Sequence, residues 1–564
     1  MEYITEAMAP TTEYDFDLLS PEKQHIYRHI QSAHINASPD GPWFFIIARN
    51  NPYKHCVQLI GITDTSMLRP QVFALQEGEV QIGLICSEKQ AIDATLQSIA
   101  SEDSRFCPVA DKYWNARGGS AADGGSFTFT IKDSEKGDGS KQLVCTNKFG
   151  DPVKTVSGQQ HYTPEIEISV KENIKTITEG IEQNFSDVYR LNKYSLESIT
   201  DWDYACLKLF CDRMILKAGQ DDKSRVKAIQ TLTFLNDRKY DTQHKKKSSA
   251  LSIIRESLTH IFSNCPKLNQ DSASAFRYID FDSRDTLRGP RDNEKVLIIN
   301  ARKFPPEGDH CDARLICNAY KTGWNQFICY GYRGQRFTGC GLSKGSDQVR
   351  IDVYGSSGDY LASGIDGLEI CVHDNAQDQV GQIMKRGKLV VFGDVGQTFM
   401  YGAKGGNVYV MGNAAGRPLI NAVGRPRVVI NGTCLDYLAE SFMAGDPLNN
   451  GGFVILNGVK FDHKGRVVPL PTPYPGSNLF SLASGGAIYL RDPDKLVVQD
   501  QLNGGEFVDL TDDDWELILP YLQENETLFG ISTENDLLTH KNRKKDYSQI
   551  YRKVQAVKLD ILAK

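Results

Sequence analysis

A repeat of about twenty residues constrains the fold of this chain more than any other feature of its sequence. Six blocks of five residues align under one another, and their last residues are 19, 19, 19, 20 and 26 positions apart. The blocks are Ile351–Gly355, Ile370–Asp374, Leu389–Gly393, Val408–Gly412, Val428–Gly432 and Val454–Gly458. A unit of this length cannot bury an apolar core by itself, so we expect the units to stack on their neighbours.

Each block has the pattern of a short β-strand followed by a corner. Its second and fourth positions before the last residue hold Val, Ile or Leu in all six blocks, whereas the residue between them varies from Asp352 to Tyr409. This alternation is typical of a strand with one face fixed in a core. The last residue is Gly in five blocks and Asp374 in the other, and both types tolerate a positive φ at a tight corner.

The glycine distribution supports a chain with several corners in each unit. Of the 48 glycines, 24 lie between Gly331 and Gly458. Together with the repeat, they predict a right-handed parallel β-helix, which is a β-solenoid, over residues 271–500. A leucine-rich repeat has a similar period, but the Leu ladder and the column of Asn or Cys that it requires are missing.

The rest of the 564 residues predicts a multidomain α+β protein. Residues 1–165 contain strand-like runs at 43–47, 71–75 and 127–130, separated by Gly, Pro, Asn and Asp, as in an α+β domain. Residues 166–270 have apolar residues at helical spacing and are expected to form a helical connector.

The carboxy-terminal residues 501–564 are expected to form a helical tail. Thr511-x-x-Asp514 is a capping signature that precedes one helix. A last amphipathic helix is expected after the basic stretch at residues 541–545. We interpret this tail as a docking segment.

Charge and hydropathy exclude two broad classes of protein. The 64 basic and 71 acidic residues leave a net charge of −7, the wrong sign for a chain that grips phosphate backbones. The basic run at residues 244–247 is therefore interpreted as a solvated loop. No run of 18 apolar residues and no secretory signal is present, so a cytoplasmic location is expected.

The cysteines are interpreted as free thiols. The thirteen cysteines are an odd number without any C-x-x-C spacing, and the closest pairs are Cys206 with Cys211 and Cys311 with Cys317. Neither pair has a second pair at the spacing of a zinc or iron–sulfur site, so no metal ligand is assigned.

The histidines and turn aspartates receive structural interpretations. His25 and His29 share a helix face near His34, but without acidic or Cys ligands nearby they are interpreted as surface residues. His373 and Asp374 are interpreted as a corner substitution and not as an acid–base pair. Asp378, Asp394 and Asp446 are expected to make local hydrogen bonds in turns. No catalytic or cofactor-binding residue is therefore assigned.

Two segments resemble the large subunit of glutamate synthases. Gly393-x2-Gly396-x5-Gly402-x2-Gly405-Gly406 through Ala414 resembles the repeats of its carboxy-terminal GXGXG β-helix domain. Residues 484–492 resemble the segment that closes that domain, and residues 501–510 resemble the exit beyond it. The same domain type occurs in one of the subunits of formylmethanofuran dehydrogenases.

The amino-terminal segment is similar to the class II glutamine amidotransferase domain of glutamate synthases. The similar residues are Gly41-Pro42-Trp43, Asp64-Thr65-Ser66-Met67-Leu68-Arg69-Pro70, Ser87-Glu88 and Gly124-Gly125-Ser126-Phe127. The family uses an amino-terminal Cys as nucleophile, whereas this chain begins Met1-Glu2 and its first cysteine is Cys56. Only 67 residues precede Leu68, so the resemblance implies a truncated, inactive domain.

The resemblance implies a subunit of an oxidoreductase. No Gly-rich phosphate loop and no cluster-ligand cysteines are found, so FMN and an iron–sulfur cluster are expected in a partner subunit of a hetero-oligomer. The leading hypothesis is a non-catalytic or co-catalytic structural subunit of a glutamate-synthase-like complex. Two alternatives stay open. One is the structural subunit with this domain type in a molybdenum or tungsten formylmethanofuran-dehydrogenase-type complex, and the other is a self-contained enzyme with residual glutamine or ligand binding.

Overall fold

The chain forms two compact units, which are described separately. In the computed structural model, the described residues are 169–557 apart from 244 and 246, and before them the backbone of four strands between residues 43 and 146. One unit combines residues 1–171 with 246–252, and the other combines residues 172–245 with 253–564.

The four amino-terminal strands form one antiparallel sheet. They are β1 (Trp43–Ala48), β2 (Val80–Cys86), β3 (Gly125–Asp133) and β4 (Lys141–Thr146), paired in the order β1-β2-β3-β4. The strands predicted at residues 43–47 and 127–130 are confirmed. The run at residues 71–75, Cys56 and the three histidines at 25, 29 and 34 lie outside the described residues.

Five helices follow, all within residues 166–270, the segment that apolar spacing predicted to be a helical connector. They are α6 (Ser169–Asn184), α7 (Val188–Ser198), α8 (Tyr204–Ala218), α9 (Asp222–Asp237) and α10 (Lys247–Ser263). Asp187, Asp203 and Asp221 begin three of them as caps, because each carboxylate accepts a backbone N–H two or three residues later. Among the described helices, none is long and apolar enough to span a bilayer.

The interpretation of the basic run at residues 244–247 as a solvated loop is wrong for Lys245. Its side chain is buried, and its ammonium donates to the carbonyl oxygens of Thr200 and Trp202. Burial lowers the pKa of Lys245, with nearby aspartates acting against that shift. Lys245 therefore connects the segment directly before α10 to the loop before α8.

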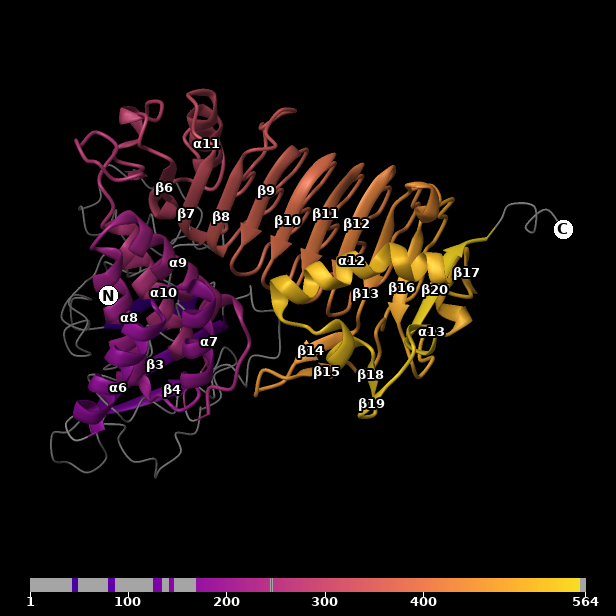
Figure 1. The fold of residues 1–564 in the computed structure, drawn as a ribbon, viewed down its shortest axis with the longest axis horizontal. Coiled ribbons are helices and arrows are strands. Elements are labelled where there is room, and N and C mark those ends of the chain that lie inside the picture. Colours follow the sequence, from indigo (N-terminus) through magenta and orange to yellow (C-terminus); the bar gives the residue numbers. More distant parts are fainter. Residues whose placement is uncertain are drawn as a thin grey trace. The chain divides into compact units, whose positions relative to one another are not determined.

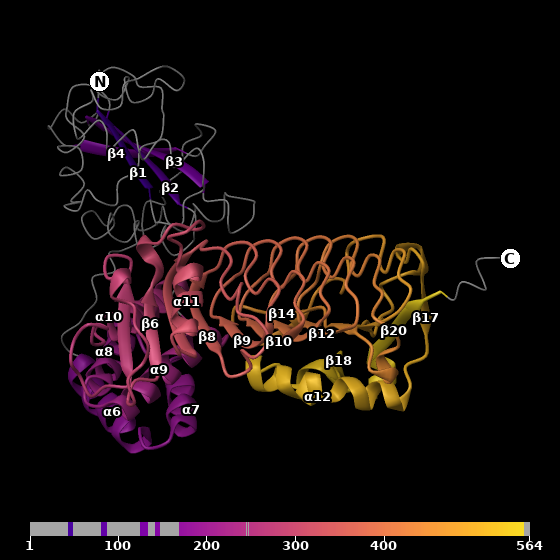
Figure 2. The same ribbon diagram turned by 90° about the horizontal axis from the view of Figure 1, so that it is seen from above.

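The second unit is built on a sheet of twelve strands. Ten of them run parallel in chain order, and the last two, β20 and β17, pair antiparallel at one edge. The strands are β5 (Phe276–Asp280), β6 (Val296–Asn300), β7 (Gln326–Arg333), β8 (Arg350–Ser356), β9 (Asp366–Val372), β10 (Arg386–Val391), β11 (Gly405–Val410), β12 (Arg425–Ile430), β13 (Phe453–Leu456), β16 (Ala487–Arg491), β17 (Gly505–Val508) and β20 (Tyr551–Ala556). Figure 2 shows β8 to β12 side by side, with their connecting loops repeating beside them.

Three helices and two hairpins are added to this sheet. They are α11 (Asp312–Lys321), α12 (Asp512–Phe529), α13 (Tyr547–Ile550), the hairpin of β14 (Val459–Phe461) with β15 (Val467–Pro469), and the hairpin of β18 (Thr539–His540) with β19 (Arg543–Lys544). The capping signature at Thr511 and Asp514 begins α12, as predicted, through reciprocal hydrogen bonds. The helix predicted after the basic stretch at residues 541–545 is limited to the four residues of α13, because residues 551–556 form β20 and pair with both β16 and β17.

Residues that occupy equal positions in the sequence blocks are paired with one another in the sheet. The ladder runs through Ile351, Ile370, Leu389, Val408, Val428 and Val454, each paired with the next. A register slip of one residue would turn every side chain to the opposite face. The repeated aliphatic row therefore specifies which face is internal.

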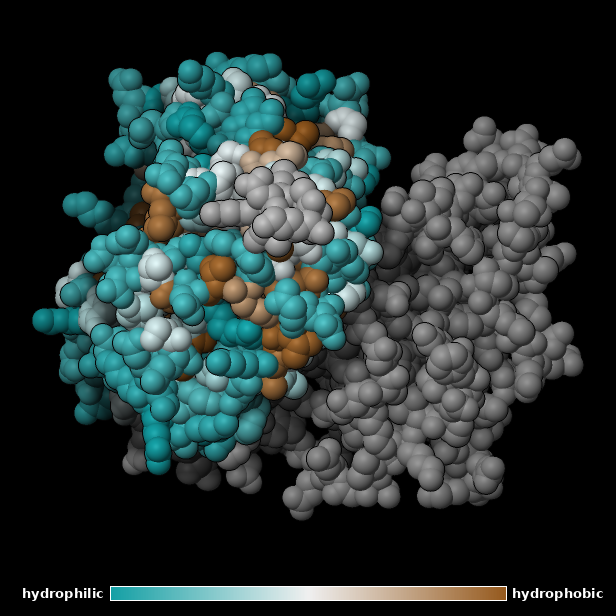
Figure 3. All heavy atoms as spheres, turned by 90° about the vertical axis from the view of Figure 1, so that its right-hand side faces the viewer, coloured by the Kyte–Doolittle hydropathy of each residue, from teal (hydrophilic) through white to brown (hydrophobic). Residues whose placement is uncertain are grey.

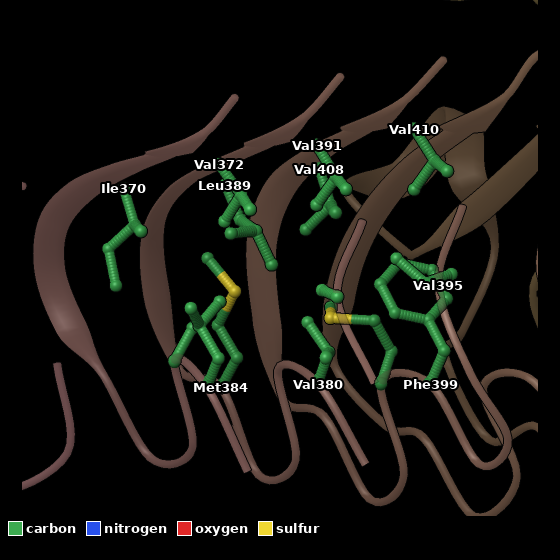
Figure 4. Close-up of a cluster of buried hydrophobic side chains, with 14 of the residues drawn as sticks. Ile370, Val372, Val380, Met384, Leu389, Val391, Val395, Phe399, Val408 and Val410 are labelled. Carbon is green, nitrogen blue, oxygen red and sulfur yellow. The ribbon is translucent and has the colours of Figure 1, made fainter. Parts of the chain in front are cut away.

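The internal face packs against the loops that follow each strand. Val391 and Val410 from the strands are fully buried, as are Val380, Met384 and Phe399 from the loops. Figure 4 shows these side chains converging between the strands and the loops. The main core therefore lies between the strand and the loop of each twenty-residue repeat and continues from one repeat to the next.

The loops repeat their backbone conformation as well. Residues Tyr360, Gln379, Thr398, Arg417 and Tyr437, spaced 19 or 20 apart, all have φ between 52° and 63°. Each donates its backbone N–H to a carbonyl oxygen of the following repeat, at 2.8–3.1 Å. Since a positive φ is unfavourable for residues other than glycine, these inter-unit hydrogen bonds help to hold the left-handed turns.

Candidate functional site

The corners after the strands carry a ladder of polar side chains. Asn375 accepts the backbone N–H of Asp394 at 2.8 Å, Asp394 accepts that of Asn413 at 2.7 Å, and Asn413 accepts that of Thr433 at 3.0 Å. A parallel ladder joins Asp378 to the N–H of Gln397 at 2.8 Å. These side chains bridge successive units and satisfy backbone donors that the corners would otherwise leave unpaired.

This ladder changes two predictions made from the sequence. Asp378 and Asp394 bond to the next unit, 19 residues away, and not locally, whereas Asp446 makes the expected local hydrogen bond to the N–H of Leu448. Gly393 and Gly412 have no positive φ. A Cβ at these positions would lie 2.3 Å from Asn375 Oδ1 and 2.1 Å from Asp394 Oδ1. Glycine is needed there because the ladder side chain occupies the space.

A buried ion pair joins the helices to the outer face of the sheet. His373 follows β9, and its Nδ1 lies 2.8 Å from Asp237 Oδ2 at the end of α9. Its Nε2 lies 3.3 Å from Asp352 Oδ1 on β8. The imidazole is stacked between Tyr354, with ring centroids 4.4 Å apart, and Phe392, at 5.4 Å.

Electrostatics keeps this imidazole protonated. Burial by itself would lower the pKa of His373, but the carboxylates of Asp237 and Asp352 raise it to about 9. Burial would raise the pKa of Asp352, but hydrogen bonds and charge from His373 and Arg350 lower it to about 2. Arg350 reaches Asp352 with two hydrogen bonds, of 2.8 and 2.9 Å.

The arrangement is a structural anchor and does not present a general base. Both nitrogens of His373 are engaged with carboxylates, and the ring is only 5% exposed. Asp374 instead pairs with Arg255 of α10 at 2.8 Å, so His373 and Asp374 are not an acid–base pair, as the sequence indicated. Sequence analysis missed Asp237, because 136 residues separate it from His373.

Replacing His373 by Gln tests the charge state of this anchor. An unfolded histidine titrates near pH 6.5, so a folded pKa of about 9 stabilises the folded chain fully below about pH 6.5. That contribution is lost as the pH rises toward 9. We expect the difference in unfolding free energy between wild type and His373→Gln to shrink by about 3 kcal/mol between pH 6 and pH 9.5.

Urea titrations at the two pH values measure this difference, and His540→Gln is the matched control. His540 also pairs with a carboxylate, Asp494 at 3.1 Å, but at the surface, where such pairs contribute little. The control should differ little from wild type at either pH. A His373→Gln defect of equal size at both pH values would contradict a protonated His373.

The outer face of the sheet is covered by α12. Val390, Tyr409, Val429 and Tyr489 pack in one cluster with apolar residues of this helix, such as Ile518. Tyr409 donates its hydroxyl hydrogen to Glu524, which also pairs with Lys388 at 2.5 Å. The alternating face of the strands is therefore covered by α12, which lies along the sheet in Figures 1 and 2.

Polar contacts fix the position of α12. Asn525 exchanges two side-chain hydrogen bonds with Asn431, the residue directly after β12, of 2.7 and 2.9 Å. At the other end, Asp514 accepts from Tyr489 at 2.6 Å and from Lys553 of β20 at 2.7 Å. Buried amides and charges that are fully paired specify one register for the helix on the sheet.

The cysteines with described side chains form no disulfides. Seven of these nine are buried, and Cys317 and Cys340 are half-buried. Burial raises the pKa of Cys211 and of Cys340 to about 12, so both stay protonated near neutral pH. Within residues 169–557 and the four strands, no group of three His, Cys, Asp or Glu side chains is arranged to hold a metal ion.

Repeats of about twenty residues form this part of the chain. Each repeat adds one strand to a parallel sheet and one polar side chain to a ladder at the corners. Residues 329–553 match the protein-family model described as GXGXG motif. The match begins in β7 and ends in β20, so it includes α12 and the repeated corners. A comparison of the chain with curated proteins gave no match. The GXGXG match is consistent with a relationship to glutamate-synthase-like oxidoreductases.

Proposed function

We propose that this chain is a non-catalytic or co-catalytic structural subunit of a glutamate-synthase-like oxidoreductase complex. The observation that carries this proposal is the GXGXG match over residues 329–553. The inter-unit register, the corner ladders and the repeated left-handed turns support a right-handed β-helix over these residues. Such a rigid stack offers long faces against which a partner can be positioned.

The proposed partner carries FMN and an iron–sulfur cluster. Within the described residues no three His, Cys, Asp or Glu side chains are grouped to hold a metal ion, so we place the proposed redox groups in a second chain. The amino-terminal residues are proposed to be a degenerate amidotransferase-like domain, on the sequence motifs alone. We locate the complex in the cytoplasm.

Exposed apolar side chains support docking at the carboxy-terminal end of the stack. Leu482 is 76% exposed on the loop before β16, and Leu496 and Val498 are exposed beyond that strand. Figure 3 shows apolar patches on this end among mostly hydrophilic residues. Gathered apolar surface of this kind is typical of interaction sites. The tail helix α12 is not available for docking with its apolar side, since that side packs on the sheet.

Native purification tests this function. We expect the chain to co-elute with a second protein that has flavin and iron–sulfur absorbance, and the chain purified alone to be colourless. Mass spectrometry identifies the co-eluting chain, and absorbance assigns the cofactors. A coloured isolated chain that reduces an acceptor without a partner would favour a self-contained enzyme, and a molybdenum or tungsten partner would favour the formylmethanofuran-dehydrogenase-type complex.

A surface variant locates the contact within the same experiment. Leu482→Asp is expected to reduce co-elution at least about tenfold while leaving the thermal midpoint unchanged, because the side chain is exposed in the isolated chain. Leu216→Asp is the matched control, since Leu216 is 60% exposed on α8, away from the sheet end. Equal co-elution of both variants would place the partner on another face.

A further inference from the structure

The guanidinium of Arg427 is enclosed by the protein without a counter-ion. Arg427 lies on the outer face of β12 beneath α12 and is 2% exposed. Its Nε and Nη1 atoms are buried without any hydrogen-bond acceptor. A guanidinium keeps its proton at all physiological pH values, so it cannot avoid this unpaired charge by deprotonation.

Other buried cations of the described residues have partners. Arg277 pairs with Glu294 at 2.6 Å, Lys553 pairs with Asp514 at 2.7 Å, and Arg491 donates to two backbone carbonyls near α12. Pairing is the rule because an uncompensated charge in the interior strongly destabilises the fold. Arg427 departs from that rule in a well-packed part of the molecule.

Aromatic contacts satisfy only the flat face of this guanidinium. It lies 4.5 Å from the ring centroid of Phe453 and 5.8 Å from that of Tyr521. A cation over an aromatic ring is attracted to the ring face, which does not replace an acceptor for the N–H groups in the guanidinium plane. These donors are therefore left without an acceptor, and an oxyanion is a group that would satisfy them.

The surroundings of Arg427 are electropositive. Arg425 precedes it by two residues on the same face and is exposed, and Lys388 lies two strands away. Glu524, the acidic residue of α12 at this position, is already engaged by Lys388 and Tyr409. Asn407, the neighbour of Arg427 on β11, is exposed and uncharged. These positive charges would attract an anion, and Glu524 would not compete with the anion for Arg427 because Glu524 is already paired.

We propose that Arg427 is the recognition residue of an oxyanion site, which takes a carboxylate or phosphate group of a small ligand between β11, β12 and α12. Nε and Nη1 are the guanidinium nitrogens that are enclosed and unpaired, so we take Nη2 as the atom of first contact. The 2% exposure of the residue favours a small anion over the acidic segment of a partner chain. A planar guanidinium suits carboxylate and phosphate oxygens because its donors match their spacing.

Thermal unfolding of the full chain tests the site. Sodium phosphate and sodium succinate, each compared with sodium chloride at equal ionic strength, are the two probes. We expect at least one oxyanion to raise the midpoint by about 2 °C or more at saturating concentration. Arg427→Met should abolish this rise, whereas Arg425→Met should keep most of it. No rise with either probe, or an undiminished rise in Arg427→Met, would overturn the proposal.

A second variant covers the case in which Arg427→Met does not fold. Asn407→Asp keeps Arg427 and places a carboxylate on the paired residue of the adjacent strand. We expect this variant to have a higher midpoint than wild type and to lose the response to the oxyanion, because the new carboxylate on the adjacent strand offers the guanidinium an acceptor and repels an anion. A lower midpoint together with a wild-type response to the oxyanion would refute the site.

Discussion

Replacing Val410 by Asp is expected to unfold the repeated part of the chain. Val410 is fully buried and pairs with Val391 and Ile430 in the adjacent strands, all within the main core. The substitution places an unpaired carboxyl group among aliphatic side chains, at a cost of about 4 kcal/mol or more. Because domains have about 5–15 kcal/mol of stability in total, we expect loss of the cooperative transition in circular dichroism.

The matched control is Val498→Asp. Val498 is 52% exposed, and it occupies a helix-capping position at which Asp is a favoured residue. The same chemical change should therefore alter the unfolding free energy by less than about 1 kcal/mol. A folded Val410→Asp variant with near-wild-type stability would show that this row of residues is not the core.

Ending the chain after Leu510 is expected to be as damaging. The deletion removes α12 and β20, so the outer-face residues Val390, Tyr409, Val429 and Tyr489 lose their cover. Each large apolar side chain that becomes exposed costs about 1.5–3 kcal/mol, and four of them approach the whole stability of a domain. The truncated chain should be found in the insoluble fraction or bind a hydrophobic dye strongly.

Removing only residues 558–564 is the control for this deletion. It leaves β20 and its pairing with β16 and β17 complete, so solubility and the thermal midpoint should stay close to wild type. If the chain that ends after Leu510 were soluble and kept the cooperative unfolding of the full chain, the tail would be an accessory segment and its apolar contacts would contribute little.

The sequence repeat was sufficient to predict the strands and their register because the signal is local and periodic. Ile370, Leu389 and Val408 occupy equal positions in their blocks, and they pair in the sheet as the alignment predicts. A parallel stack with a buried aliphatic row permits only that register. The helices from α6 to α10 were found in the same way, from apolar spacing along single segments.

Glycine positions show where a correct pattern led to an incomplete physical reason. The sequence predicts corners at Gly393 and Gly412, and the strands do end there. The residue type is required by the side chains of Asn375 and Asp394 in the preceding units, which leave no space for a Cβ. Such a contact joins residues of different units, so the conformation of a single corner does not reveal it.

The sequence by itself determined the repeat, the strand register, the internal aliphatic row and the helical segments, because these depend on the periodicity of neighbouring residues. Only the tertiary structure decided that α12 covers Tyr409, that Asp237 holds His373, and that Arg427 lies buried without a counter-ion. These features join segments that are as many as 136 residues apart. Which distant segments meet is decided by packing of the whole unit, and that information is not contained in the pattern of any one segment.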